Sequence, residues 1–300
     1  MSTSSNPLSG QVGIVTGAGK GLGRAFALDL AAAGATVIVN NRNRQIDENG
    51  LGPADHVVAE ISAAGGVAVA EYSDVSDPNA AETLVQLALE RYGRIDFLVT
   101  NAAISGVAMF HKMTPAQFDA VTEINVGGTA RLAMLCSREM RKAEFGRIVL
   151  IASTAGLHGE PTASAYSASK GAVIALGRAI AREGAPRNVL TNVVLPYATT
   201  QMTETGMNEK YRDVMTSEAV APVVTALVDP ESQLNGELLV CAAGGLRVAA
   251  AVEYGSVRLP ANLSSAKLAD LVVASRNRPP REFADAQVAF LDFAAEVTDD

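Results

Sequence analysis

Most of the sequence predicts an α/β fold with one doubly wound parallel sheet, and three observations carry this prediction. Short apolar runs alternate with longer amphipathic segments from residue 12 to about residue 245. The runs are rich in Val, Ile and Leu and rarely alternate with polar residues, as is typical of strands buried on both faces. Strand and helix follow each other in strict turn, which favours right-handed crossovers and helices on both faces of the sheet.

About seven strands are expected, because seven apolar runs are bounded by Gly, Asn, Asp or Pro. The expected strands cover residues 12–16, 36–40, 67–72, 95–100, 147–153, 189–196 and 237–241. The segments between them have apolar residues at helical spacing. They predict helices over residues 22–33, 54–64, 77–92, 115–141, 164–184 and 218–228.

The chain is expected to form one large domain with additions at both ends. Residues 1–9 are polar with no apolar run behind them, so we expect a flexible tail rather than a signal peptide. Residues 10–245 form the α/β domain. The pattern then changes to a C-terminal helical extension, residues 246–300, with helical segments near 264–275 and 282–297.

Composition and charge argue against several classes of protein. Hydrophobic residues make up 48% of the chain and charged residues 19%, which is enough for a sizeable core. A net charge of −8 argues against nucleic-acid binding, and no apolar stretch reaches the roughly 18 residues of a membrane span. Cys136, Cys241 and the histidines lack metal-ligand spacing, so no metal is expected. A cytoplasmic protein without membrane or nucleic-acid partners is predicted.

Residues 14–25, IVTGAGKGLGRA, run from the first expected strand through a glycine-rich turn into the first helix. Gly17 allows the tight turn, Gly21 lets backbone approach a pyrophosphate, and Gly23 allows the helix to pack closely on the strand. The helix N-terminus adds free N–H groups and a positive dipole end. A glycine triplet alone is weak evidence, but in this context it predicts a dinucleotide-binding, Rossmann-type domain.

The end of the second strand bears on the choice of cofactor. Asn41 stands where an acidic side chain would bind a ribose hydroxyl and repel a 2′-phosphate. Arg42 and Arg44 follow, and Lys20 lies in the glycine loop on the same side. Charge-assisted contacts to phosphate then favour NADP(H). The alternative is NAD(H), with both arginines merely solvated loop residues.

The helical stretch SAYSASKGAVIAL, residues 164–176, carries a phenol and an ammonium on one face, because Tyr166 and Lys170 are four residues apart. A phenol with a pKa near 10 exchanges protons poorly at neutral pH, and a nearby cation favours its ionised form. This pair therefore predicts general acid–base catalysis. The alternative is a tyrosine at the core's edge beside a lysine whose stem is buried and whose head reaches water.

Two further polar residues favour the catalytic interpretation. Ser153 ends the expected strand 147–153, at the edge of the sheet where ligands bind. Asn125 lies inside a helical run and is followed by two glycines, which weaken a helix. Such a position suggests a function, for example a water molecule held by a freed carbonyl group.

Together these motifs resemble the short-chain dehydrogenase/reductase family over residues 8–245. In the family's order they are TGAGKGLG, DV (74–75), TNAA (100–103), Asn125, Ser153 and YSASK (166–170). The resemblance implies a catalytic tetrad of Asn125, Ser153, Tyr166 and Lys170. With the glycine loop and the cations above, the predicted cofactor-binding residues are Gly17, Lys20, Gly21, Leu22, Gly23, Asn41, Arg42, Asp74, Val75, Asn101, Ala102, Tyr166, Lys170 and Pro196.

Within the family, the chain is most similar to the (3R)-hydroxyacyl-CoA dehydrogenase portion of peroxisomal multifunctional enzymes and their bacterial relatives. Four stretches carry this similarity: the widened loop 41–54 and residues 57–75, 196–207 and 218–244. The similarity implies a 3-hydroxyacyl or 3-ketoacyl thioester substrate. Two features depart from the usual pattern: TNAA replaces Asn-Asn-Ala-Gly, and Tyr197 follows Pro196 where many members have Gly.

The expected activity is hydride transfer between a nicotinamide cofactor and a secondary alcohol or ketone. Tyr166 protonates the carbonyl oxygen, Ser153 orients it, Lys170 lowers the tyrosine pKa, and residues 198–217 form a lid over the substrate. The alternatives are the same chemistry on a steroid or small xenobiotic carbonyl, or a nucleotide-sensing protein without catalysis. By analogy with the family, a homodimer or homotetramer is expected, formed through helices 115–141 and 164–184.

Overall fold

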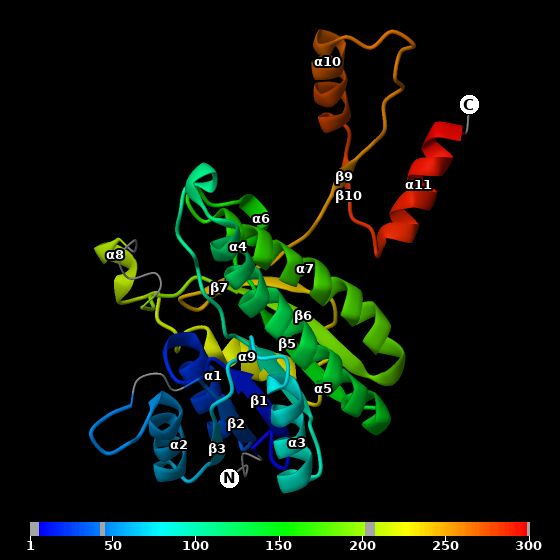
Figure 1. Cartoon of the computed structure of the whole chain (residues 1–300). Helices are drawn as coiled ribbons and strands as arrows, with labels where there is room; N and C mark the ends of the chain where they lie inside the picture. The colour runs from blue at the N-terminus through cyan, green and yellow to red at the C-terminus, as the bar shows by residue number, and fades with distance from the viewer. Residues whose placement is uncertain (1–5, 43–45, 202–207, 299–300) are drawn as a thin grey trace. The chain divides into compact units, whose positions relative to one another are not determined.

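The central sheet of the computed structural model has eight strands in the order β3-β2-β1-β4-β5-β6-β7-β8 (Figure 1). The structure describes residues 6–42, 46–201 and 208–298. Seven strands lie at the expected places and pair in parallel, which confirms the doubly wound α/β fold. They are β1 (Val12–Thr16), β2 (Thr36–Asn40), β3 (Val67–Glu71), β4 (Phe97–Thr100), β5 (Gly146–Ile151), β6 (Val189–Pro196) and β7 (Leu238–Ala242).

The eighth strand, β8 (Gly245–Ala249), was not predicted. It follows β7 after two residues, Ala243 and Gly244, which both have positive φ. Two such residues form the tight turn of a β-hairpin, so the chain reverses and β8 adds an edge to the sheet. The strand lies where the sequence was expected to leave the sheet for its helical extension.

Helices cover both faces of this sheet (Figure 1). On one face, α1 packs against both α2 and α9; on the other, α5 packs against α3 and α7. Their bounds are α1 (Gly21–Ala32), α2 (Pro53–Ala63), α3 (Ala80–Tyr92), α5 (Thr129–Ala143), α7 (Ser164–Gly184) and α9 (Ala221–Val228). The short elements α6 (Ala155–His158), α8 (Glu209–Arg212) and the 3₁₀ turns η1 (Phe110–Lys112) and η3 (Ala185–Arg187) were not predicted.

The expected single helix over 115–141 is interrupted. It consists of α4 (Pro115–Thr122), a six-residue π-helical segment η2 (Glu123–Gly128) and then α5. A π-helical turn accommodates an extra residue, so the side chains after it point in different directions from those of a regular helix. The weakness predicted at Asn125 and the two glycines is therefore a local change of helix type.

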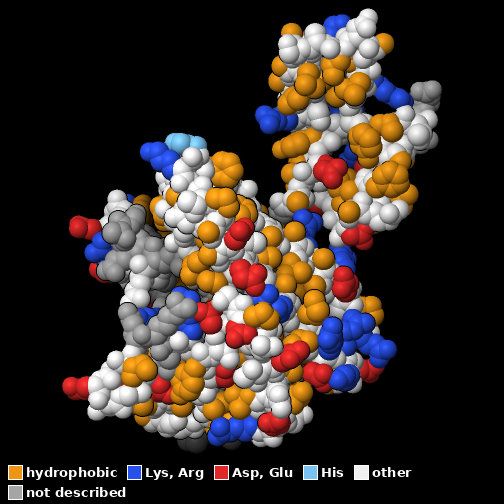
Figure 2. All heavy atoms as spheres, in the orientation of Figure 1, with side chains coloured by type: hydrophobic (Ala, Val, Ile, Leu, Met, Phe, Trp, Pro, Cys, Tyr) orange, Lys and Arg blue, Asp and Glu red, His pale blue; other side chains and the backbone are white. Residues whose placement is uncertain are grey.

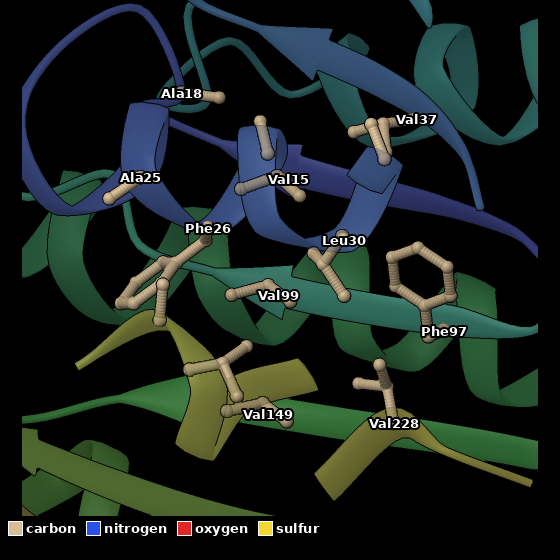
Figure 3. Packing of buried hydrophobic residues seen from close by; sticks show 14 of the residues in the cluster. Val15, Ala18, Ala25, Phe26, Leu30, Val37, Phe97, Val99, Val149 and Val228 are labelled. Carbon is tan, nitrogen blue, oxygen red and sulfur yellow. The ribbon is translucent and has the colours of Figure 1, made fainter. Parts of the chain in front are cut away.

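The core beside the glycine-rich turn fixes the start of α1 against the sheet. Phe26 and Leu30 of α1 lie against the strand residues Val15, Val99 and Val149, and all five are fully buried (Figure 3). This packing holds the N-terminus of α1 at the carboxyl ends of β1 and β4, where the strand order reverses. In doubly wound sheets, ligands bind at that point.

The expected N-terminal tail is only partly described, because residues 1–5 lie outside the described part of the chain. Leu8 is fully buried in the core, and its N–H donates to the carbonyl oxygen of Ala33 at 3.0 Å. Residues next to Leu8 are therefore held against the domain.

By their internal contacts, the residues divide into two units, Met1–Val248 and Ala249–Asp300. In the smaller unit, β9 (Glu253–Tyr254) pairs antiparallel with β10 (Pro280–Arg281). Its helices, α10 (Ser265–Arg276) and α11 (Ala286–Thr298), lie close to the expected segments 264–275 and 282–297. Neither helix buries a residue, and Figure 2 shows hydrophobic side chains exposed on this unit.

Candidate active site

A cavity of about 780 Å³ lies at the carboxyl ends of the central strands. Nearly all predicted cofactor-binding and catalytic residues line it. They are Gly17, Lys20, Gly21, Leu22, Asn41, Arg42, Asp74, Val75, Asn101, Ala102, Ser153, Tyr166, Lys170 and Pro196. Of the predicted residues that the structure describes, Gly23 and Asn125 do not line the cavity. Arg44 and part of the predicted lid, residues 202–207, are outside the described residues.

The glycine-rich turn has the geometry expected of a phosphate-binding loop. Gly17 and Gly21 have φ angles of 63° and 52°, which side chains rarely permit. A Cβ on Gly23 would lie 2.3 Å from the carbonyl oxygen of Gly17, so only glycine allows α1 to approach the turn. The N-cap residue of α1, Lys20, makes no capping bond with its side chain. The backbone N–H groups and dipole at this end of α1 therefore suit the pyrophosphate of a dinucleotide.

Asn101, which follows β4, is hydrogen-bonded to the glycine-rich turn and to the end of β1. Its backbone N–H donates to the Thr16 hydroxyl at 3.0 Å, and its side-chain Nδ2 donates to the carbonyl oxygens of Thr16 and Gly17, both at 3.1 Å. The N–H of Ala102 also donates to the Thr16 hydroxyl, at 3.1 Å. These bonds join the segment after β4 to the turn after β1, and both border the cavity.

Arg42 does not stand alone at the adenosine end of the cavity, because it pairs with Asp74 at 3.2 Å. Burial alone would raise the pKa of Asp74, but hydrogen bonds from Ser76 and Arg42 outweigh it and hold this pKa below its ordinary value. Asp74 is thus a carboxylate beside the cation expected to bind a 2′-phosphate. Asn41 keeps the position after β2 free of an acid, but Arg42 there pairs with the predicted cofactor-binding residue Asp74.

Sequence reasoning missed three polar residues near this end. Asn40 and Ser73 line the cavity, and the buried Glu71 accepts hydrogen bonds from Asn40 Nδ2 at 2.7 Å and from the Ser73 N–H at 2.9 Å. Their positions could have indicated them, because Asn40 ends β2 and Glu71 ends β3. The carboxyl ends of these parallel strands lie at the same edge of the sheet, where ligands bind.

Tyr166, Lys170 and Ser153 converge on the other end of the cavity. Tyr166 and Lys170 lie one turn apart on α7, and Ser153 follows β5. The Ser153 hydroxyl accepts a hydrogen bond from the N–H of Ala155 at 3.1 Å, and it lies close enough to Tyr166 to lower the pKa of that phenol. The buried Lys170 Nζ donates to the carbonyl oxygen of Ile151 at 2.7 Å and lies 5.7 Å from the centre of the Tyr166 ring.

The pKa of Tyr166 is raised in the structure, whereas the sequence predicts that Lys170 lowers it. Burial raises the pKa of Tyr166, and the hydrogen bond with Ser153 opposes this without reversing it. Burial also lowers the pKa of Lys170 to about 8. Within the protein, Ser153 is therefore the group that favours the ionised tyrosine.

Asn125 is buried in η2, and both the oxygen and the nitrogen of its side-chain amide are hydrogen-bonded. Its Oδ1 accepts from the N–H of Ile104, and its Nδ2 donates to the carbonyl oxygen of Ile104 and to Ser169 Oγ, each at 2.9 Å. The side chain therefore holds the loop after β4 against α7. Its contact with Ser169 was not predicted.

Two negative findings concern the described part of the chain. Over residues 6–42, 46–201 and 208–298, no helix has the length and apolar character needed to cross a membrane. Within the same residues, no group of three His, Cys, Asp or Glu side chains is placed to hold a metal ion.

Comparison with known proteins agrees with this geometry. The model of the short chain dehydrogenase family matches residues 11–215. A Mycobacterium tuberculosis protein named as a short-chain type dehydrogenase/reductase is 37% identical over 77% of this chain and 82% of its own length. Mouse peroxisomal multifunctional enzyme type 2 is 35% identical over 95% of this chain, which spans only 37% of that enzyme. A 3-oxoacyl-[acyl-carrier-protein] reductase of Synechocystis is 39% identical over 66% of this chain and 78% of its own length.

Solved structures are similar over most of the chain. A short chain dehydrogenase from Mycobacterium avium is 33% identical with a TM-score of 0.79, covering 92% of this chain and 98% of that one. A protein from Beutenbergia cavernae, described as an NAD(P)-dependent gluconate 5-dehydrogenase with bound NADP at low occupancy, is 31% identical with a TM-score of 0.71; the match covers 80% of this chain and 98% of that one. The chain is therefore a member of the short-chain dehydrogenase/reductase family, an NAD(P)-dependent oxidoreductase that acts on a small-molecule substrate.

Proposed function

We propose that this enzyme interconverts a 3-hydroxyacyl and a 3-ketoacyl thioester, with NADP(H) as cofactor and Tyr166 as the acid and base. The observation that carries the proposal is the convergence of Tyr166, Ser153 and Lys170 at one end of the 780 Å³ cavity that the glycine-rich turn borders at the other. The family membership supports the hydride chemistry, and the cavity residues support the assignment of roles.

The residues fit a nicotinamide dinucleotide along the length of the cavity. Gly17, Gly21 and the N-terminus of α1 would hold the pyrophosphate, Asp74 and Val75 would contact the adenine, and Lys170 would hold the nicotinamide ribose. When bound, the nicotinamide supplies the hydride for reduction or accepts it in oxidation.

In reduction, Tyr166 donates its proton to the carbonyl oxygen while the carbonyl carbon gains the hydride. Ser153 hydrogen-bonds the same oxygen and fixes its distance from Tyr166. The phenolate that remains is stabilised by the nearby charge of Lys170, although the protein alone leaves the pKa of Tyr166 raised. Oxidation uses the same atoms in reverse, with the phenolate accepting the alcohol proton.

The preference for NADP(H) rests on Lys20 and Arg42 in the cavity wall and on Asn41 in place of an acid. The thioester rests on the similarity to the Synechocystis 3-oxoacyl reductase and the mouse multifunctional enzyme. Homo-oligomeric assembly and a cytoplasmic location stay predictions.

A matrix of cofactors and substrates tests the proposal. NADPH and NADH are combined with acetoacetyl-CoA, a steroid ketone and a simple ketone, and nicotinamide absorbance is followed. We expect the highest kcat/KM for NADPH with acetoacetyl-CoA. Tyr166→Phe is expected to lower it by about 10²- to 10⁴-fold, the usual contribution of a general acid.

Tyr92→Phe, at the end of α3 and outside the cavity, is the matched control and should match the wild type. Retention of most activity by Tyr166→Phe would contradict the proposed catalytic role. A steroid or simple ketone as the best substrate would contradict the thioester alone.

A further inference from the structure

The Asn125 amide has no hydrogen atom left for a further partner. One Nδ2 hydrogen is directed to the carbonyl oxygen of Ile104 and the other to Ser169 Oγ, both at 2.9 Å. The N–H of Ile104 donates to Oδ1 at 2.9 Å, which fixes the orientation of the amide because the flipped amide would place two donors together. Asn125 and Ser169 are 1% and 2% exposed, so water does not compete for these bonds.

Ser169 extends this network into the helix that carries the proposed acid. Its hydroxyl donates to the carbonyl oxygen of Tyr166 at 2.8 Å and uses an oxygen lone pair to accept from Asn125. Of the contacts described for the Asn125 side chain, this is the one that reaches α7. A continuous path therefore runs from the loop after β4, through Asn125 and Ser169, to the backbone of Tyr166.

Both ends of this path border the cavity. Ala103 and Ser105, on either side of Ile104, line it, and so do Tyr166 and Lys170, the residue after Ser169. The first turns of α7 are also tied to β5 through Lys170 and the carbonyl oxygen of Ile151. Two contacts from different elements thus fix α7 beside the cavity.

We propose that Ser169 is a positioning residue, which sets the place of Tyr166 relative to the cofactor wall by joining the helix to Asn125. The proposal rests on the proposed role of Tyr166 and adds a residue that touches neither substrate nor cofactor. Without the hydroxyl, one Nδ2 hydrogen of Asn125 is buried and unpaired. Relief requires the loop, Asn125 or α7 to move, and small displacements of reacting groups slow an enzyme steeply.

The experiment compares Ser169→Ala, Ser169→Cys and the control Ser164→Ala, in the full chain, with Tyr166→Phe measured alongside. Ser164 is the first residue of the same helix and lies outside the hydrogen-bonded path. Cysteine is only slightly larger than serine and is a weak hydrogen-bonding group, so it leaves no cavity and serves as a second variant should Ser169→Ala fail to fold. NADPH binding is followed by its fluorescence, and activity with acetoacetyl-CoA and a simple ketone.

We expect both Ser169 variants to bind NADPH within about twofold of the wild type, and kcat to fall roughly 10- to 100-fold with KM little changed. The pH profile of alcohol oxidation should also move to higher pH, because a displaced Tyr166 loses its bond with Ser153. A merely structural serine would lower the melting temperature and leave kcat and this profile of the folded enzyme unchanged.

The outcomes separate this proposal from the proposed function. Wild-type kcat and pH profile in Ser169→Cys, while Tyr166→Phe is inactive, would overturn the role of Ser169 and leave the mechanism intact. An active Tyr166→Phe would overturn the mechanism itself. An equal fall of kcat in Ser164→Ala would also overturn the proposal, because the effect would then not depend on the contact with Asn125.

Discussion

The ammonium of Lys170 lies 5.7 Å from the centre of the Tyr166 ring, yet its hydrogen bond goes to the carbonyl oxygen of Ile151 at the end of β5. Lys170 therefore binds the catalytic helix to the sheet, and it is near the phenol without being bonded to it. Burial raises the pKa of Tyr166, with Ser153 acting in the opposite direction. Tyr166 is thus protonated at neutral pH, the state that the proposed reduction requires.

The first prediction concerns the direction of the reaction and pH. Oxidation needs the phenolate, so its kcat should rise with pH above neutrality, whereas reduction needs the phenol and should be constant and then fall. Ser153→Ala removes the hydrogen bond that lowers the pKa of Tyr166, so its oxidation profile should move to higher pH. Rates in both directions are measured from pH 6 to 10. An oxidation profile that moves to lower pH would contradict the assigned role of Ser153.

The second prediction concerns stability. Burial lowers the pKa of Lys170 from an ordinary value of 10.5 to about 8. Between these values the unfolded chain holds a proton that the folded chain has released, so the free energy of unfolding should rise with pH. One pKa unit corresponds to about 1.4 kcal/mol, which limits the gain to about 3 kcal/mol.

The free energy of unfolding of Lys170→Met should not rise with pH in this way. Below pH 8 the variant should not be destabilised by a buried ammonium, which the wild type must carry there. Urea unfolding of both proteins at pH 7.5, 9 and 10 measures the difference between them. A constant difference across this range would show that Lys170 keeps its ordinary pKa in the folded protein.

The third prediction concerns the Arg42–Asp74 pair. To bind Arg42, the 2′-phosphate of NADPH must compete with Asp74 and come to lie near the Asp74 carboxylate, which repels it. Asp74→Asn removes both effects, so this variant should favour NADPH over NADH. Exposed ion pairs contribute up to about 1 kcal/mol, which corresponds to roughly a fivefold change in selectivity. Arg42→Gln should change selectivity in the opposite direction. The dissociation constants of both cofactors are measured by fluorescence.

Asp77→Asn is the control for this pair, because Asp77 is exposed, accepts from the N–H of Asn79 and does not line the cavity. Equal selectivity in Asp74→Asn and the wild type would mean that Asp74 does not compete for Arg42.

The fourth prediction concerns the packing of α1 on the glycine-rich turn. In Gly23→Ala the new Cβ would meet the Gly17 carbonyl oxygen at 2.3 Å and Asn101 Nδ2 at 2.5 Å. Backbone must move, so we expect a loss of about 1–3 kcal/mol in unfolding free energy and weak cofactor binding. In the control Gly171→Ala, the new Cβ would lie 3.4 Å from the carbonyl oxygen of Gly156, an ordinary contact, and stability should be kept or improved. Calorimetry and NADPH titration check both.

Local patterns predicted those parts of the fold that are buried and regular. Most of the parallel strands, such as β1, β4 and β5, consist of buried residues that each add to the apolar signal. Strand β8 left no such signal, because Leu246 and Val248 are 57% and 66% exposed. The π-helical segment was indicated only by Asn125 and two glycines, which mark a weak point in a helix without specifying its type.

The candidate site was predictable in its members and less so in their partners. The tetrad and the glycine loop follow from sequence motifs. In contrast, Arg42 meets Asp74 across 32 positions of sequence, and Asn125 meets Ser169 across 44. Such contacts depend on how loops and helices approach each other in three dimensions. The pKa of Tyr166 likewise depends on the folded surroundings, since burial raises it and the hydrogen bond with Ser153 opposes this.

The π-helical segment also limits how this sequence can change by insertion or deletion. Removing one residue between Glu123 and Gly128 would restore a regular helix and remove a local irregularity. The same deletion would keep α5 in phase with α4, because the π-helical turn takes up one residue, but it would tighten the turn that carries Asn125. A gain in helical regularity would then come with a misaligned Asn125, so length variation is expected to be tolerated in surface loops and not in this stretch.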